Sequence, residues 1–266
     1  MATRKNKKKS QLHIQPSIIL FFIVSVLSIL FILKFCRKKP SLPQKKSDFV
    51  EAYGIRIPSG YAIHGIDISV HQGNVNWDKI AAATEKNIKI DFVIIKATEG
   101  ITRQDLNFKK NWQKAAHHSF KRGAYHFFLP RRDARKQAEN YINTVNLEKG
   151  DIVPIIDVEK NTGISSQELI DKIKTFITIV ENHYNAKPII YTNINFYNVY
   201  LNDKFFKKYP LWISCYFEHD RFYKEFKEPW VIWQHSEKGT VKGVGNHVDF
   251  NVFNGSVSDF EKLCIP

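Results

Sequence analysis

The chain has 266 residues, of which 43% are hydrophobic and 25% are charged, and this composition excludes a disordered or collagen-like protein. Its three cysteines, Cys36, Cys215 and Cys264, are too few for a disulfide framework and lack the spacing of a zinc site. Of the 40 basic residues, 11 lie in residues 1–47, which contain no acid, so 29 basic face 26 acidic residues in the remainder. A broad nucleic-acid-binding face is therefore not expected.

The first predicted element is a membrane-spanning helix that follows a basic segment over residues 1–16. Residues 17–33 read SIILFFIVSVLSILFIL, with 14 strongly apolar residues and three serines. A bilayer core needs about 17–25 such residues in a helix, so we expect an uncleaved anchor over residues 17–36. A cleaved signal peptide is the alternative, but the following LKFCRKKP offers no small-residue cleavage site. Basic residues flank both ends of the span and do not decide its orientation.

A linker is predicted next, over residues 37–60, because the segment begins with lysines and contains Pro40, Pro43 and Pro58. The folded domain is expected to cover residues 61–266. Its eight apolar runs predict strands at 62–69, 91–98, 123–128, 151–159, 187–193, 211–216, 230–236 and 247–253. Helical patterns lie between the early runs, at 76–87, 108–120, 133–145 and 165–184.

The alternation of strands and helices favours an α/β fold. Eight strands in about 200 residues indicate a (β/α)8-like barrel with its last helices reduced or missing. A doubly wound open sheet is the alternative. No glycine-rich nucleotide motif follows any of the strands.

Acidic residues near the ends of the predicted strands are the candidate catalytic groups: Asp67, Asp157, Glu159 and Asp249. Buried carboxylates are costly, and Asp157 and Glu159 point to the same face of one strand. Clustered carboxylates suit glycosidic bond cleavage, in which one acid donates a proton and another stabilises the positive sugar ring. A hard-cation site and structural ion pairs are the other interpretations.

Aromatic and polar side chains form a second group of candidates. Most aromatic residues are expected in the core, but those near strand ends could lie against sugar rings. Glu99 is a second-tier candidate that could simply end its strand. The scattered residues His64, His71, His126 and His235 lack metal-ligand spacing and are expected to be structural.

The residues around these acids resemble those of the family 25 glycoside hydrolases, the Chalaropsis-type lysozymes. Ten segments in the family's order carry the resemblance across nearly all of residues 61–266, among them GIDISVHQGNVNW (65–77), FVIIKATEG (92–100), RGAYHFF (122–128), PIIDVE (154–159) and VDFN (248–251). The resemblance implies a β/α barrel with fewer helices than strands. It also implies hydrolysis of the β-1,4 bond between N-acetylmuramic acid and N-acetylglucosamine.

The same resemblance assigns roles to individual residues. Glu159 would be the general acid and base, Asp157 would position the substrate's acetamido group, and Asp67 and Asp249 would tune the charge of the site. Substrate-binding positions would be Tyr125, Tyr191, Trp212, Tyr216, Gln234 and Glu99. Lys96 stands where the family commonly has an arginine, which removes a bidentate donor. A retaining mechanism through the acetamido group fits best, and a carboxylate nucleophile or an inverting water are the alternatives.

These expectations together describe a membrane-tethered muramidase. It would be a monomer without a metal or cofactor, with its N-terminus inside the cell and its barrel facing the wall. Peptidoglycan would be its partner and nucleic acid would not. A catalytically silent wall-binding barrel is the alternative, and a metal-dependent hydrolase is the third interpretation.

Overall fold

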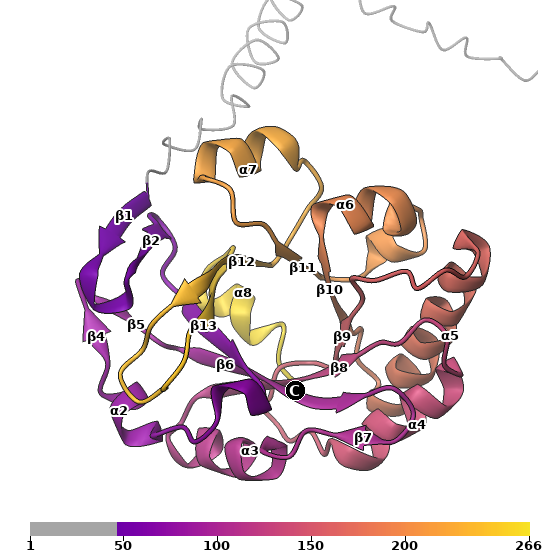
Figure 1. The fold of residues 1–266 in the computed structure, drawn as a ribbon, viewed down its shortest axis with the longest axis horizontal. Coiled ribbons are helices and arrows are strands. Elements are labelled where there is room, and N and C mark those ends of the chain that lie inside the picture. Colours follow the sequence, from indigo (N-terminus) through magenta and orange to yellow (C-terminus); the bar gives the residue numbers. More distant parts are fainter. Residues whose placement is uncertain (1–46) are drawn as a thin grey trace, which may run out of the picture. The chain divides into compact units, whose positions relative to one another are not determined.

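The computed structural model describes residues 47–266, which include the whole predicted domain (Figure 1). The predicted basic segment at 1–16 and anchor at 17–36 lie outside the described residues. Within residues 47–266, no helix is long and apolar enough to cross a membrane.

Eight strands close into a barrel, and each coincides with one of the eight predicted apolar runs. They are β3 (His64–Ile68), β6 (Phe92–Glu99), β8 (Lys121–Phe127), β9 (Ile155–Asp157), β10 (Ile189–Asn193), β11 (Leu211–Ser214), β12 (Ile232–Gly239) and β13 (Val248–Phe253). Neighbours from β3 through β12 are parallel, whereas β13 is antiparallel to both β12 and β3. Residues 240–247 are too short a connection for the helical crossover that a parallel partner of β12 would need. The barrel prediction is confirmed, but its last strand runs in the opposite direction.

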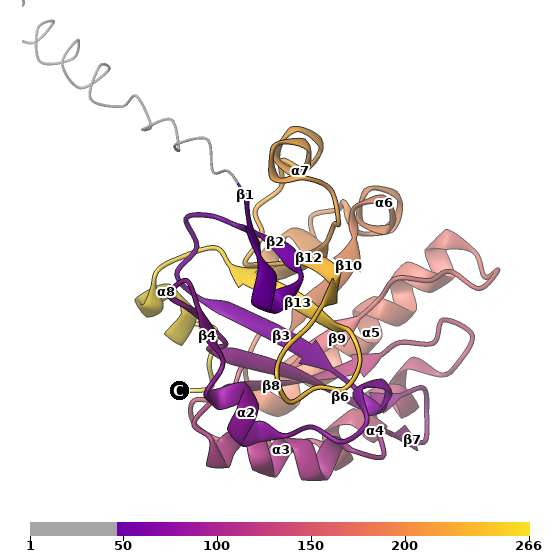
Figure 2. The same ribbon diagram turned by 60° about the vertical axis from the view of Figure 1, so that its left-hand side comes forward.

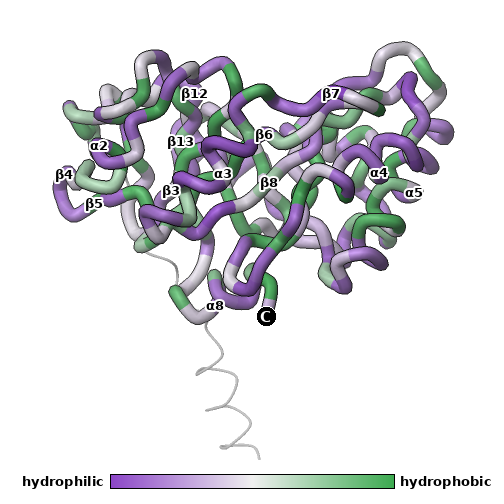
Figure 3. Tube along the Cα trace, turned by 90° about the horizontal axis from the view of Figure 1, so that it is seen from below, coloured by the Kyte–Doolittle hydropathy of each residue, from purple (hydrophilic) through white to green (hydrophobic). Residues whose placement is uncertain are grey.

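Three longer helices cover the outside of the early strands: α3 (Phe108–His117), α4 (Ala134–Thr144) and α5 (Ser166–Tyr184). The side chain of Ser165 caps the start of α5 by accepting from the Glu168 amide. The predicted apolar face of α5 is buried. Figure 3 shows hydrophobic and hydrophilic residues alternating along α4 and α5.

The later connections contain only short elements, as the sequence predicts for the reduced half of the barrel. They are α6 (Ile194–Phe196), η3 (Tyr197–Leu201), η4 (Phe206–Lys208), α7 (His219–Glu225) and α8 (Val257–Glu261). A short turn, η2 (Val70–Gln72), follows β3.

The helix predicted over 76–87 is wrong in its second half. Helix α2 (Trp77–Ala81) ends early, and the hairpin of β4 (Thr84–Glu85) and β5 (Ile88–Lys89) follows. Lys86 and Asn87 form its two-residue turn with positive φ angles of 50° and 63°. Two successive left-handed residues make a turn that matches the twist of the flanking strands, so the hairpin forms despite the helical composition.

The expectation of a linker over 37–60 does not hold for its described part. Strand β1 (Ser47–Val50), the turn η1 (Glu51–Tyr53) and strand β2 (Ile55–Pro58) form a hairpin. Val50, Tyr53 and Ile57 belong to the apolar core, so this segment buries enough apolar surface to be ordered. The Thr240 amide donates to the Tyr53 carbonyl oxygen at 2.9 Å, which joins the hairpin to the end of β12. Figure 2 shows the hairpin beside β12.

Two apolar layers surround the strands, one inside the barrel and one beneath the helices. Side chains alternate between the layers, so Ile94 points inward and Ile95 outward. Along a strand the inward positions change from apolar to polar, as from Ile155 to Asp157 on β9. This change places the polar side chains together at the carboxyl ends of the parallel strands, while Phe260 of α8 helps to close the opposite end.

Candidate active site

All four predicted acids come together at the polar end of the barrel. Asp67 of β3 lies directly opposite Asp249 of β13 in the strand register. Asp157 ends β9 and Glu159 follows two residues later. The charges of both Glu159 and Asp67 raise the pKa of Asp157, and the charges of Asp67 and Glu159 raise that of Asp249. The predicted cluster is therefore one electrostatic unit.

Asp67 and Asp249 form a carboxyl pair that shares a proton. Burial, the charge of Asp67 and a hydrogen bond to Asp67 raise the pKa of Asp249 to about 9. Burial also raises the pKa of Asp67, but hydrogen bonds from Asn251, Gln234 and Asp249 favour its ionised form. A hydrogen bond between two carboxyl groups requires a proton between them, and the raised pKa values of both residues favour that protonated pair.

Asp67 is held by two amide side chains on the same oxygen. Its Oδ2 accepts from Gln234 Nε2 at 2.9 Å and from Asn251 Nδ2 at 2.7 Å. All three side chains are buried, so the Asp67 carboxyl group is fixed under the mouth of the barrel at a defined position.

Asp157 is buried, and its Oδ1 has no hydrogen-bond partner among the described residues. Burial raises the pKa of Asp157 well above its usual range, and the charge of Glu159 adds to this effect, while Lys96 opposes it. Burial therefore favours the protonated form of Asp157 relative to an exposed aspartate. The unpartnered oxygen of Asp157 is available to a polar group of a bound molecule.

Glu159 is half-buried and continues from the end of β9. The backbone there is held by the Val158 amide, which donates to the Tyr191 carbonyl oxygen at 3.0 Å. Within residues 47–266, neither Glu159 nor Asp157 forms an ion pair with a basic side chain. The interpretation of these two acids as structural ion pairs therefore fails.

Gln234 connects two predicted substrate-binding tyrosines to the acids. The hydroxyls of Tyr191 and Tyr216 donate to Gln234 Oε1 at 2.9 Å and 2.8 Å. Because Gln234 Nε2 donates to Asp67, these bonds fix the orientation of the amide. Tyr125 belongs to the same neighbourhood, since burial and the charge of Asp157 raise its pKa.

Trp212 lies beneath the site rather than on its surface, with 2% of its surface exposed. Its indole N–H donates to Asn251 Oδ1 at 2.8 Å, and its ring packs edge-on against Tyr191 at 4.5 Å. Trp212 therefore supports the site through Asn251, which the sequence interpretation missed. The sequence signal for Asn251 was its place in VDFN (248–251), two residues after Asp249 and on the same face of the strand.

Glu99 is engaged in ion pairs at the end of β6. Its carboxylate accepts from Lys96 Nζ at 2.6 Å and Arg103 Nη1 at 3.1 Å. Burial alone would raise its pKa, but the hydrogen bonds and charges of Lys96 and Arg103 outweigh burial and lower it. Lys96, at the position of the family's common arginine, also lies over the Phe127 ring at 4.7 Å.

The predicted structural histidines on the strands are buried, and two of them have hydrogen-bond partners. His126 Nδ1 lies 2.7 Å from Thr98 Oγ1, and its Nε2 lies 3.2 Å from Gln137 Oε1. His64 Nε2 lies 3.1 Å from the Tyr61 carbonyl oxygen. In the described part of the chain, no group of three or more His, Cys, Asp and Glu side chains is arranged to hold a metal ion.

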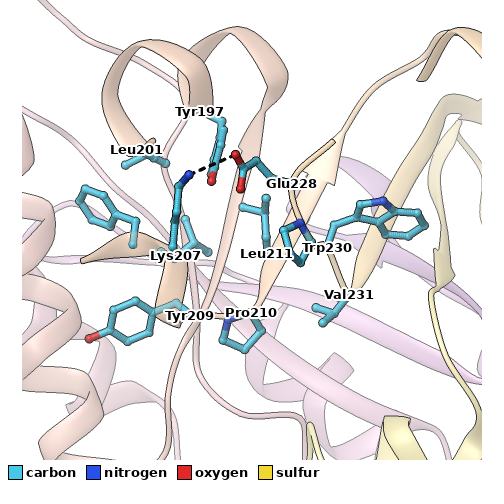
Figure 4. Close-up of a pocket in the computed structure, with 12 residues that line it drawn as sticks. Tyr197, Leu201, Lys207, Tyr209, Pro210, Leu211, Glu228, Trp230 and Val231 are labelled. Atoms are coloured by element: carbon cyan, nitrogen blue, oxygen red, sulfur yellow. Dashed lines mark hydrogen bonds and ion pairs between the residues drawn. The ribbon is translucent and has the colours of Figure 1, made fainter. Parts of the chain in front are cut away.

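A separate cavity of about 120 Å³ lies at the start of β11 and just before β12, and none of the four acids lines it (Figure 4). Lys207 Nζ and Glu228 Oε1 form an ion pair across it at 3.2 Å. Its other walls, such as Tyr197 and Trp230, are apolar or aromatic. This cavity offers no acid–base group near the predicted reaction.

Comparisons with known proteins agree with this arrangement. The sequence model described as glycosyl hydrolases family 25 matches residues 66–244. The chain is 38% identical over 212 residues to the uncharacterized protein YegX of Escherichia coli (strain K12), covering 80% of this chain and 77% of that protein. It is 28% identical over 212 residues to lysozyme M1 of Streptomyces globisporus, covering 74% of this chain and 69% of that protein.

A solved structure shows the same fold. The family 25 glycosyl hydrolase from Bacillus anthracis matches with a TM-score of 0.66 and 31% sequence identity, over 76% of this chain and 93% of that one. The eight-stranded barrel, the acids at its mouth and the match over most of the domain lead to one assignment: this chain belongs to glycosyl hydrolase family 25.

Proposed function

We propose that the protein is a peptidoglycan muramidase that cleaves the β-1,4 bond between N-acetylmuramic acid and N-acetylglucosamine. Its membership of a glycosyl hydrolase family and its similarity to a protein named lysozyme support this activity. The observation that carries the proposal is the close pairing of a buried Asp157, whose Oδ1 has no hydrogen-bond partner among the described residues, with a Glu159 that has no ion-pair partner there. Glycosidic cleavage needs such clustered carboxyl groups in different protonation states.

In the proposed mechanism, Glu159 is the general acid. It donates its proton to the leaving glycosidic oxygen as the carbonyl oxygen of the substrate's own acetamido group attacks C1 and the C1–O bond breaks. A water molecule then attacks C1, the bond between C1 and the acetamido oxygen breaks, and Glu159 takes the proton of that water. Two displacements at C1 retain its configuration.

The remaining acids orient and stabilise the sugar. The unpartnered Oδ1 of Asp157 is placed to accept a hydrogen bond from the acetamido N–H, which aligns that group for attack. In this proposal the Asp67–Asp249 pair, which carries one negative charge when it shares a single proton, stabilises the developing positive ring. Proton NMR of the first sugar anomer released would distinguish retention from inversion.

The test compares the full-length wild-type chain with Glu159→Gln on purified peptidoglycan, with released ends reduced and identified by mass spectrometry. We expect muramic acid at the reducing ends from the wild type alone, and Glu159→Gln should still sediment with the wall. Glu139→Gln, on the exposed face of α4, is the matched control and should remain active. An active Glu159→Gln would remove Glu159 from the acid role.

Two further outcomes separate the alternatives. An inactive wild type that folds and sediments with the wall would favour a silent binding protein. Loss of wild-type activity on treatment with a chelator would favour the metal-dependent hydrolase.

We also propose that residues 17–36 anchor the protein in the cytoplasmic membrane, with the barrel on the wall side as a monomer. The apolar run supports the anchor, and the location of peptidoglycan supports the orientation. A monomer suffices because one chain supplies every residue of the site. Detergent extraction from membranes, protease accessibility in spheroplasts and sedimentation in detergent test these three points.

A further inference from the structure

A groove of about 350 Å³ lies beside the active site, between the N-terminal hairpin and β12. One wall comes from β1 and β2, including Phe49 and Arg56. The opposite wall comes from the segment after β11, including Tyr216 and Phe217, and from β12. The hairpin precedes residues 66–244, the range that matches the family, so the groove has one wall that the family match does not include.

The groove gathers exposed aromatic side chains. In the described part of the chain, three large aromatic residues are exposed, and all three line this groove: Phe49 (49%), Tyr216 (48%) and Phe217 (39%). The guanidinium of Arg221 lies over the Phe217 ring at 3.8 Å, which restrains that ring. Exposed apolar surface concentrated in one concave place is typical of a binding site.

A buried histidine also belongs to the lining of the groove. His235 is 8% exposed, and its Nε2 has no hydrogen-bond partner among the described residues. Burial lowers the pKa of His235 to about 3, so the ring is neutral and offers one donor or acceptor rather than a charge. Leaving such an atom unpaired costs free energy that a bound polar group would recover.

Tyr216 connects the groove to the catalytic acids. Its ring lines the groove, while its hydroxyl donates to Gln234, whose amide donates to Asp67. A linear glycan that occupies the acid cluster would therefore reach the groove by crossing a single side chain.

We propose that this groove is an additional subsite for the same glycan strand, binding N-acetylated sugar units beyond those at the cleavage point. The inference rests on the proposed muramidase function. Flat aromatic faces and a neutral ring nitrogen suit uncharged sugar rings with hydroxyl and acetamido groups. The guanidinium of Arg56, which donates to the Ser47 carbonyl oxygen at 3.2 Å, lies at the edge of this surface and has further N–H groups for sugar hydroxyls.

The experiment measures binding by full-length Glu159→Gln, so that turnover does not interfere. Labelled glycan strands freed of their stem peptides are used at two lengths, a tetrasaccharide and strands of about twelve sugars. The variants are Phe49→Ala alone and with Phe217→Ala, and Val257→Ala is the control because it is exposed on α8, at the opposite end of the barrel. Unchanged thermal unfolding shows that each variant is folded.

We expect Phe49→Ala/Phe217→Ala to raise Kd for the long strands about tenfold, which corresponds to about 1.4 kcal/mol for the two aromatic contacts together. Tetrasaccharide binding and the Val257→Ala control should be unchanged. Equal losses at both lengths, or no loss, would overturn the subsite. A parallel measurement uses long strands that keep their stem peptides, and a loss confined to those strands would assign the groove to peptide and overturn the glycan proposal.

Failure of the proposed function gives a different result. If the wild type cleaves no peptidoglycan but the length-dependent loss of binding remains, the muramidase proposal fails and the subsite stands. If the wild type cleaves and the length dependence is absent, only the subsite fails.

Discussion

The proton shared by Asp67 and Asp249 makes stability depend on pH in a predictable direction. The folded-state pKa of Asp249 is about 9, against an ordinary value of 3.8. Folding near neutral pH therefore takes up a proton, and the stability that this group contributes is present in full below about pH 4 and is lost as pH rises toward 9. Asp249→Asn removes the titration, because an amide can donate to Asp67 at every pH.

The size of the effect follows from the gap in pKa. In the unfolded chain the Asp249 carboxyl has its ordinary pKa of 3.8, so pH 7 lies about three units above that pKa. Each unit corresponds to about 1.36 kcal/mol, which gives an upper bound of about 4 kcal/mol on the change in the free energy of unfolding. Asp249 is only partly buried, so solvent screening reduces the expectation to about 2 kcal/mol. Between pH 4 and pH 7, the free energy of unfolding of Asp249→Asn should therefore rise by about 2 kcal/mol relative to that of the wild type.

Urea unfolding of the full-length protein at pH 4.5, 6, 7.5 and 9 measures this difference. Tryptophan fluorescence is a suitable probe because the five tryptophans of the chain all lie within the described domain. Asp48→Asn, at an exposed acid on β1, is the control for a general change in charge. Parallel stability curves for Asp249→Asn and the wild type would refute the shared proton.

Three further predictions concern stability. Gly65→Ala should lower the free energy of unfolding in urea by about 1–3 kcal/mol, because its Cβ would lie 2.4 Å from the Phe92 ring. Gly245→Ala is the control: it has open space around it and should leave the stability unchanged. Arg122→Leu should cost about 3–5 kcal/mol, since it strands the Asp151 carboxylate that Arg122 holds at 2.7 Å; a thermal midpoint unchanged from the wild type would contradict this. Asn251→Leu should lower stability by about 2–4 kcal/mol, because it removes a hydrogen bond from Asp67 and another from Trp212; calorimetry that finds it as stable as the wild type would exclude the network.

The barrel could be predicted because its strands carry their own signal. Each strand is a short apolar run, and α5 shows a regular spacing of Leu169, Ile173 and Phe176 along one face. The hairpins could not be predicted in the same way. The sequence around Lys86 and Asn87 has a helical composition, and only the left-handed backbone at those residues produces the turn. Pro40, Pro43 and Pro58 suggested a linker over residues 37–60, but in its described part a contact with the end of β12 orders the segment.

The active site likewise contains residues that could be predicted from the sequence and residues that could not. The acids could be located because each follows an apolar strand, which makes its burial conspicuous. The role of Asn251 could not, because it depends on a hydrogen bond to Trp212, which is remote along the chain. The supporting position of Trp212 depends on which end of the barrel the ring occupies, and an apolar pattern does not contain that information.

The closure of the barrel by its first and last strands has a consequence for when activity can arise. Asn251 holds Asp67 across 184 residues of sequence, and Asp249 meets Asp67 only when β13 has paired with β3. A ribosome must therefore release almost the whole domain before the shared proton and the fixed charge exist. A chain that lacks its last strand therefore cannot assemble the site, and the enzyme carries no complete acid cluster until its synthesis is nearly finished.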